Sequence, residues 1–403
     1  MTIAVRTVSP DELEAFLTAF SIGLGIELSQ DHADRVRRYV ALDRLSAAVE
    51  GHRVVGTFGV HPLSVAVPGT TIPMAGVSMV TVLPTHRRRG ILTQMMRQHL
   101  NDFRRRGEIL AGLWASEGNI YGRFGFGMAV ERVRWRIPRS FAVLREPVDS
   151  QGTMHMIGHR EAVEQLPPLY DTVWPHRPGM LRRQIPWWEH RIIADTHGAS
   201  LGSQRRVLYA PDGIPQGYAL YRTRRFDIER PLELQVTEVV ARDGESERAL
   251  WQFLFGVDLT DTIDVWNLPA DHSLRWWLAD IRKVERQVGD ALWLRLVDVP
   301  ACLASRHYVG PGRLSIRVDD SVCPWNSATF LLESDGAGRA TCRTTDAAPD
   351  VSCSVEQLGS VYLGGVRWSN LAQAGLVRGT DNALSLADRL FGWPTTPWCP
   401  ERF

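Results

Sequence analysis

The chain has 403 residues, of which 44% are apolar and 23% charged, and its formal net charge is +1. At roughly 150 residues per domain, this length predicts two to three domains. The composition is typical of a folded globular protein and excludes long disorder. A net charge so close to zero argues against a protein that binds nucleic acid through a broad basic surface.

The cysteines predict neither disulfides nor a metal site. Their number is odd, and no Cys-x-x-Cys or Cys/His pairing occurs, so we expect free thiols in a reducing cytoplasm and no bound metal. The N-terminal stretch has no apolar signal core, and no run of about 20 apolar residues predicts a membrane span. The five cysteines are Cys302, Cys323, Cys342, Cys353 and Cys399.

The first third of the chain, residues 1–150, predicts an α/β domain. A helix opened by Ser9-Pro10-Asp11 is followed by short β-rich runs over 47–82, with turns at Gly51 and Pro68-Gly69. An amphipathic helix and a buried strand over 109–115 come next, and then a Gly-rich aromatic segment, GNIYGRFGFG, over 118–127. The helix places its apolar side chains at helical spacing on one side: Ile91, Leu92, Met95, Met96, Leu100 and Phe103.

The middle third, residues 151–290, repeats this order. Residues 205–222 predict a hairpin that turns at Asp212-Gly213, and an apolar strand, a polar loop and an amphipathic helix follow it. In the first copy the loop before the helix reads Arg-Arg-Arg-Gly, whereas in the second copy it reads Asp-Gly-Glu-Ser-Glu over 243–247. A carboxylate-rich loop repels a diphosphate, so we expect the second copy to be structural and not to bind one.

Residues 291–403 predict a third domain of the α+β type. Sequence patterns typical of β-strands return from Ala291 onward, and helical stretches follow over 354–363 and 384–390.

The strongest chemical signal is the loop over 84–92, PTHRRRGIL, between a strand and a helix. The first N–H groups of a helix lack intrahelical partners, and together with the positive helix end they suit a diphosphate. Gly90 permits close approach of the backbone, and the arginines add charge-assisted hydrogen bonds. The alternative is a solvated basic loop before an ordinary core helix.

This loop resembles the acetyl-CoA motif of the GNAT acetyltransferase superfamily, Gln/Arg-x-x-Gly-x-Gly/Ala before a helix. Arg87 and Gly90 match the motif, and Leu92 replaces its last small residue. THRRRG with its Met-rich helix, ASEGNIYGRFGFG, WLRLVDVPACL and SVYLGG together resemble the Eis (enhanced intracellular survival) family of actinobacterial N-acetyltransferases. The similarity extends over most of the chain.

The resemblance implies tandem GNAT-like domains followed by a sterol-carrier-protein-like C-terminal domain, assembled as a homohexamer. It implies transfer of acetyl from acetyl-CoA to an amine-bearing small molecule, such as an aminoglycoside or a similar polyamine, at one or several positions. A protein lysine as acceptor, and a non-catalytic regulator that binds CoA or an apolar ligand, remain alternatives. Carried onto this sequence, the acetyl-CoA contacts are Val80, Thr81, Val82, Arg88, Arg89, Gly90, Ile91, Leu92, Thr93, Ser116 and Glu117.

Two further residues are catalytic candidates. A phenol at Tyr121 can protonate a departing thiolate, although an aromatic plug beside Phe124 and Phe126 explains the same residue. In the Eis family the C-terminal carboxylate acts as general base, and this role falls here on Phe403; a merely packed tail is the alternative. We expect His86 and His99 to be polar surface residues rather than catalysts.

Overall fold

The computed structural model describes residues 3–28, 30–149, 154–194, 202–224 and 232–403. Contacts between residues divide the chain into two compact units. The first unit contains Met1–Val130, Ala291–Pro397 and Glu401–Phe403. The second contains Glu131–Asp290 and Trp398–Pro400. The first unit therefore combines the first and the last thirds of the sequence.

The first sheet carries the loop that the sequence singles out. Over the described residues its strand order is β1-β2-β3-β4-β5-β14-β6, and only the β4–β5 pair is parallel. Gly51 and Gly69 close its hairpins with φ of 64° and 77°, which favours glycine. The strands are β1 (Ile3–Thr7), β2 (Leu45–Glu50), β3 (Arg53–Val67), β4 (Thr70–Val82), β5 (Leu110–Trp114), β6 (Gly127–Met128) and β14 (Leu292–Leu296).

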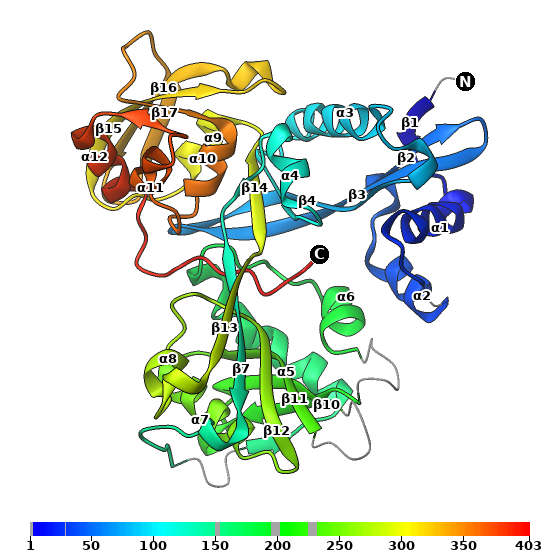
Figure 1. Ribbon diagram of the computed structural model, residues 1–403, viewed down its shortest axis with the longest axis vertical. Coiled ribbons are helices and arrows are strands. Elements are labelled where there is room, and N and C mark those ends of the chain that lie inside the picture. Colours follow the sequence, from blue (N-terminus) through cyan, green and yellow to red (C-terminus); the bar gives the residue numbers. More distant parts are fainter. Residues whose placement is uncertain (1–2, 29, 150–153, 195–201, 225–231) are drawn as a thin grey trace. The chain divides into compact units, whose positions relative to one another are not determined.

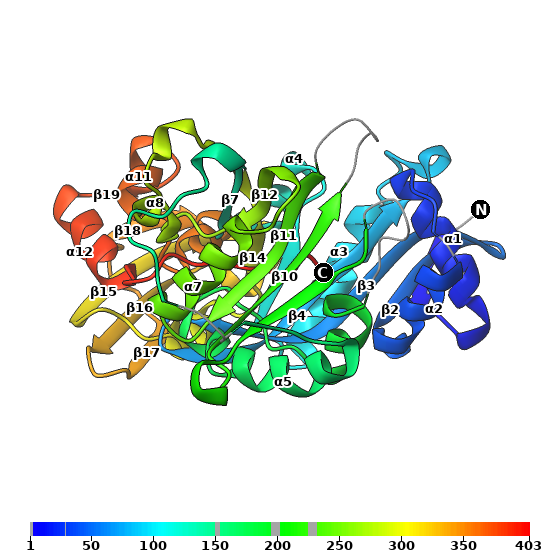
Figure 2. The ribbon, with the colours of Figure 1, turned by 90° about the horizontal axis from the view of Figure 1, so that it is seen from below.

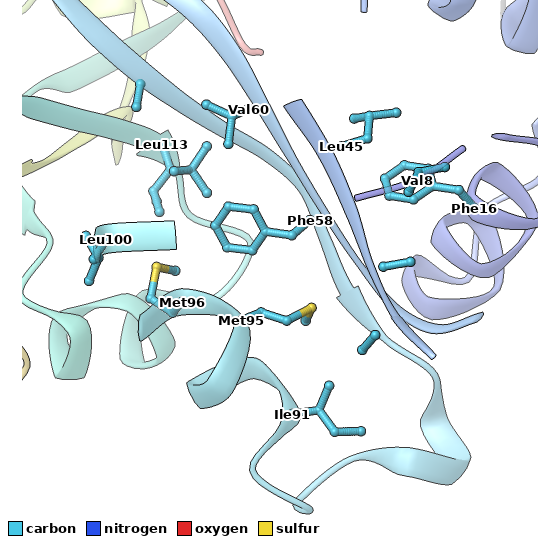
Figure 3. Packing of buried hydrophobic residues seen from close by; sticks show 14 of the residues in the cluster. Val8, Phe16, Leu45, Phe58, Val60, Ile91, Met95, Met96, Leu100 and Leu113 are labelled. Carbon is cyan, nitrogen blue, oxygen red and sulfur yellow. The ribbon is translucent and has the colours of Figure 1, made fainter. Parts of the chain in front are cut away.

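Helices cover both faces of this sheet (Figure 1). They are α1 (Leu13–Leu24), α2 (Gln30–Tyr39), α3 (Ile91–Arg105) and α4 (Gly118–Tyr121). As predicted, the apolar side of α3 is buried: Met95, Met96 and Leu100 are fully inaccessible. Figure 3 shows them gathered near Phe58, whereas Phe16 of α1 lies near Leu45. The apolar periodicity of α3 is thus explained by burial against the sheet.

Five consecutive strands of the second sheet follow the same order as the first five strands of the first sheet, whereas the sixth strand of each sheet comes from elsewhere in the chain. The order of the second sheet over the described residues is β13-β7-β12-β11-β10-β9-β8, again with one parallel pair, β11–β12. Figure 2 shows its central strands β12, β11 and β10 side by side. The strands are β7 (Glu131–Pro138), β8 (Met154–Met156), β9 (Arg205–Tyr209), β10 (Gly217–Arg224), β11 (Leu232–Ala241), β12 (Thr260–Leu268) and β13 (Glu285–Asp290). The helices are α5 (His159–Asp171), α6 (Ile185–Trp187), α7 (Gly244–Phe255) and α8 (Leu274–Trp277).

The two sheets take strands from outside the sequence boundaries that we drew. The division at residue 150 puts β7 in the first domain, yet its hydrogen bonds place it in the second sheet, between β12 and β13. The division at residue 291 puts β14 in the third domain, yet it pairs with β5 and β6 of the first sheet. Strand pairing links segments distant in sequence, which a local pattern does not record.

The C-terminal part of the first unit is a separate sheet with helices. Its order over the described residues is β17-β16-β15-β18-β19. The strands are β15 (Pro311–Asp319), β16 (Ala328–Asp335), β17 (Ala340–Thr344), β18 (Val351–Ser354) and β19 (Arg378–Gly379). The helices are α9 (Val299–Ser305), α10 (Val355–Val361), α11 (Trp368–Gln373) and α12 (Asp381–Phe391). None of the helices in the described ranges is long and apolar enough to cross a membrane.

Candidate active site

Strands β4 and β5 part after a short parallel contact. They pair at Ala75–Ala111 and Gly76–Gly112, and within the described residues they pair nowhere else, although β4 continues to Val82. The edge of β4 beyond Gly76 is therefore open to an extended ligand whose amides can bond to the strand backbone.

The open part of β4 also carries a bulge. The register with β3 shifts between Thr57 and Gly59, and Met79 has φ of 50°. The hydroxyl of Thr57 donates to the carbonyl of Met79 at 2.8 Å, which holds this conformation. Bulges redirect the local backbone and are frequent next to active sites.

The loop after β4 delivers an uncapped helix end to the same gap. Gly90 is the N-cap of α3, with φ of 78°, and no described side chain accepts a hydrogen bond from this helix end. Arg88 has φ of 60°, is exposed, and forms no ion pair or hydrogen bond with any residue that the structure describes. Free N–H donors and a free guanidinium at one helix start form a site suited to a diphosphate.

The other two arginines of the loop have structural partners. Arg87 donates to the carbonyl of Gly23 at 2.8 Å, which ties the loop to the end of α1. Arg89 donates to Glu50 at 2.8 Å, and the ring of His86 bonds to the same carboxylate at 3.1 Å. Hydrogen bonds from Arg89 and His86 lower the pKa of Glu50. This carboxylate therefore fixes the shape of the loop from behind.

Tyr121 is the last residue of α4 and is 6% exposed. Its ring contacts Phe126 edge-on, with centroids 6.2 Å apart. Burial raises the pKa of Tyr121, a hydrogen bond with Ser116 lowers it, and the charge of Glu117 raises it, with a net upward shift. The phenol thus stays protonated at neutral pH, as a proton donor requires.

One cleft of about 880 Å³ brings most of the predicted residues together. Its lining includes the predicted residues Val80, Thr81, Val82, Arg88, Gly90, Ile91, Leu92, Thr93, Ser116, Glu117 and Tyr121. Arg89 and Phe403 are absent from the described residues that line it. The lining also includes residues that were not predicted as contacts: Gly23, Leu24, His86, Arg87, Ile120 and Arg123. Arg87 was within the recognised motif, but nothing in the sequence indicated that the end of α1 would reach this cleft.

The two histidines are buried, contrary to expectation. His86 is 7% exposed because its ring is held between Thr85 and Glu50. His99 is 8% exposed, stacks on Phe58, and bonds to Ser46 at 2.5 Å. Burial lowers the pKa of His99 to about 4.

The chain end is packed rather than frayed. Phe403 is 8% exposed and Glu401 is 3% exposed. Within the second unit, Asn267 donates to the carbonyl of Cys399 at 2.9 Å and accepts from the indole of Trp398 at 3.0 Å. These hydrogen bonds anchor Trp398 and Cys399 to Asn267.

The corresponding region of the second copy is closed by its own side chains. Asp243 caps α7 by accepting from the N–H of Ser246 at 2.8 Å. On β11, Glu238 accepts from Arg183 and from the hydroxyl of Tyr218, and all three residues are buried. The helix end is occupied and the strand faces a buried ion pair, so this region carries neither feature of the first cleft.

Comparisons with known proteins identify two acetyltransferase-like domains and a third, different domain. Two family models described as acetyltransferase (GNAT) domains match residues 4–129 and 179–296, and a sterol carrier protein domain matches 299–400. An uncharacterized N-acetyltransferase of Streptomyces coelicolor is 39% identical over 88% of this chain and 87% of its own length. The N-acetyltransferase Eis of Mycobacterium bovis is 36% identical over 83% of this chain and 82% of its own.

A solved structure extends the likeness to three dimensions. The crystal structure of Eis1 from Mycobacterium abscessus covers 99% of this chain and 100% of its own, with a TM-score of 0.87 and 33% identity. The predicted architecture of two GNAT domains followed by a sterol-carrier-like domain is confirmed. The chain belongs to the Eis family of GNAT proteins and is an acetyl-CoA-dependent N-acetyltransferase.

Proposed function

We propose that this enzyme acetylates amine groups of an aminoglycoside or a similar polyamine, at one or several positions. The observation that carries the proposal is that one cleft holds an uncapped helix end, the protonated Tyr121, and Arg88, which has no partner in the described part of the chain. The relative from Mycobacterium bovis bears the name N-acetyltransferase Eis, which supports an amine as acceptor.

The chemistry needs a binding end and a proton-handling end. Acetyl-CoA supplies an acetyl group activated as a thioester. Arg88 and the first N–H groups of α3 suit its diphosphate, and the open edge of β4 suits its amide arm. Val80, Thr81, Val82, Thr93, Ser116 and Glu117 complete this side of the cleft. Arg89 would serve indirectly, through Glu50, rather than by contact.

The proton steps fall to Tyr121 and the chain end. The acceptor nitrogen bonds to the acetyl carbon as the carbon–sulfur bond breaks, and Tyr121 gives its phenolic proton to the sulfur. The proton lost by the nitrogen goes to the carboxylate of Phe403, which is absent from the described lining of the cleft, so a relaying water would carry it there. A free terminal carboxylate has a pKa of about 3.5, so it accepts a proton from an ammonium only through desolvation or a relaying water.

The assay is thiol release from acetyl-CoA with a panel of aminoglycosides, linear polyamines and lysine peptides. Turnover with aminoglycosides or polyamines supports the proposal, and turnover with lysine peptides alone favours the protein-lysine alternative. Mass spectrometry of the product counts the acetyl groups added. Deleting Phe403 moves the terminal carboxylate back by one residue, to Arg402, and should abolish turnover; full activity of that variant would show that the carboxylate need not stand on Phe403.

We also propose a homohexamer in the cytoplasm. All five cysteines are free, which supports a reducing compartment. Sedimentation velocity distinguishes a hexamer from a monomer of 45.3 kDa.

The core of the C-terminal domain argues against the alternative of a regulator that binds an apolar ligand there. Arg306 is fully buried there and donates to the carbonyls of His307 at 3.1 Å and Phe391 at 2.9 Å. Its guanidinium also lies over the rings of Tyr308 and Phe391, 4.7 and 4.9 Å from their centroids. A buried guanidinium makes this interior a poor host for an apolar ligand.

A further inference from the structure

The Gly-rich segment after Tyr121 is not explained by the cleft. Gly122, Gly125 and Gly127 are absent from the described residues that line it. Gly122 has helical dihedrals, φ −56° and ψ −39°, which any residue adopts. A different constraint must therefore keep its side chain absent.

Helix α10 of the sterol-carrier-like domain occupies the space that side chains would need. A Cβ atom on Gly122 would lie 2.9 Å from Oε1 of Glu356, and one on Gly127 would lie 1.9 Å from the backbone carbonyl of Glu356. A Cβ atom on Gly125 would lie 2.6 Å from Cγ1 of Val355. The glycines thus mark the surface on which α10 packs.

A buried arginine fixes the same segment from β14. Arg295 is fully inaccessible and donates through Nε to the carbonyl of Phe124 at 2.8 Å. Its Nη2 atom donates to Asp320 at 2.5 Å, and Asp320 accepts from the backbone N–H groups of Val322 and Cys323. The carboxylate that orients Arg295 is therefore itself held by the C-terminal domain.

Hydrogen bonds and a ring contact connect the segment that Arg295 holds to Tyr121. The N–H of Phe126 donates to the carbonyl of Tyr121 at 3.3 Å, and the N–H of Gly125 donates to that of Gly122 at 2.8 Å. Phe126 also packs edge-on against the ring of Tyr121. A shift of the Phe124 carbonyl therefore moves the backbone that carries Tyr121.

We propose that the sterol-carrier-like domain positions the catalytic acid. Arg295, oriented by Asp320, and helix α10 hold the segment 122–127 so that Tyr121 points into the cleft. This inference rests on the proposed role of Tyr121. Arg295, Asp320 and Glu356 are positioning residues, since none of them lines the cleft. Misplacing a reacting group by about 1 Å costs on the order of 100-fold in rate, so modest displacements are measurable.

The first test is a substitution and its compensation across the contact. Gly122→Ala keeps a favourable backbone and should fold, but its methyl group meets the Glu356 carboxyl. The Glu356 carboxyl ends a flexible side chain and can turn aside, so we expect kcat to fall only about threefold. KM for acetyl-CoA should stay within about twofold, because the diphosphate end is untouched. Glu356→Ala in the same chain should restore most of kcat. Unchanged kcat in Gly122→Ala, or no restoration by the second substitution, would overturn the proposal.

The second test asks whether Arg295 acts through Tyr121. Arg295→Met should lower kcat roughly tenfold in the native background and less than about twofold in Tyr121→Phe, because neighbours acting as a unit are not additive. Equal losses in both backgrounds would overturn the positioning role. An unchanged kcat in Tyr121→Phe alone would instead remove the proposed acid, and this inference with it.

A matched control separates positioning from lost stability. Arg183→Met in the second unit also breaks a buried ion pair, with Glu238, outside the first copy. It should destabilise the protein and leave kcat unchanged at a temperature where it remains folded. A loss of kcat equal to that of Arg295→Met would show that instability alone explains both and would overturn the proposal. Should Arg295→Met not fold, the Gly122 and Glu356 series decides by itself.

Discussion

The two GNAT copies share the order of their first five strands and differ in what fills the space beside the fourth strand. In the first copy, Gly90 leaves the start of α3 uncapped, and Arg88 has no hydrogen-bond or ion-pair partner among the described residues. In the second, Asp243 caps α7, and Arg183 pairs with Glu238 where β11 continues past β12. The same scaffold therefore becomes a binding cleft or a closed core according to whether its polar groups are left open or satisfied internally.

The largest expected effect is a loss of stability when the buried ion pair of the second copy is broken. Removing one member of a buried ion pair leaves an uncompensated charge, so Arg183→Met should lower the free energy of unfolding by about 3–5 kcal/mol. Denaturant titration measures the loss. A change below about 1 kcal/mol would mean that the pair is accessible to water and that the second copy is less closed than its contacts indicate.

The next effect concerns acid stability in the first copy. His99 has a pKa of about 4 when folded, against about 6.5 unfolded, so only the unfolded state gains a proton between these values. Stability should therefore fall as pH drops from about 6.5 to 4, by about 3 kcal/mol in total. His99→Phe should remove most of this dependence, as followed by urea unfolding across that pH range. An identical pH dependence in the variant would contradict the assignment.

Tyr121→Phe should lower kcat roughly 100-fold, the usual contribution of a general acid. Since the pKa of Tyr121 is raised, loss of activity through its ionisation should begin only above about pH 10. Trp276→Phe on α8, the counterpart of α4 in the second copy, is the control and should retain full kcat. Activity in Tyr121→Phe close to that of the intact enzyme would leave the first copy a binding cleft without its acid.

Arg88→Ala should raise KM for acetyl-CoA roughly tenfold and leave kcat nearly unchanged, because charge-assisted hydrogen bonds to the diphosphate are lost. Arg97→Ala, exposed on the outer side of the same helix, is the charge-matched control. Arg89→Ala sharpens the comparison: a smaller rise than for Arg88 agrees with its pairing to Glu50, and an equal rise would show direct contact with the cofactor.

The smallest expected effect is the loss of stability when the N-terminal cap of α7 in the second copy is removed. Asp243→Ala should cost about 1 kcal/mol of stability and create no second acetyl-CoA site. Calorimetric titration counts the sites, and Asp258→Ala serves as the control for removal of an exposed carboxylate. A second binding event in Asp243→Ala would show that the cap alone keeps the second copy closed.

The sequence predicted those features that depend on residues close together in the chain. The apolar spacing of α3, the hairpin at Asp212-Gly213 and the opposite charge of the two loops all follow from neighbouring residues. It did not predict that Arg89 would turn to Glu50, or that Gly23 would line the cleft, because both contacts join segments far apart in the chain. The resemblance to a family supplied the candidate residues, and the packing distinguishes those that face the cleft from those that support it.

The position of β14 has a consequence for biosynthesis. This strand lies between β5 and β6 in the sheet, yet its residues follow the whole second copy in the chain. A ribosome must therefore translate past Leu296 before the first sheet can close, and until then β5 and β6 lack their common neighbour. A nascent chain stalled earlier exposes an unpaired strand edge, the kind of surface that chaperones cover.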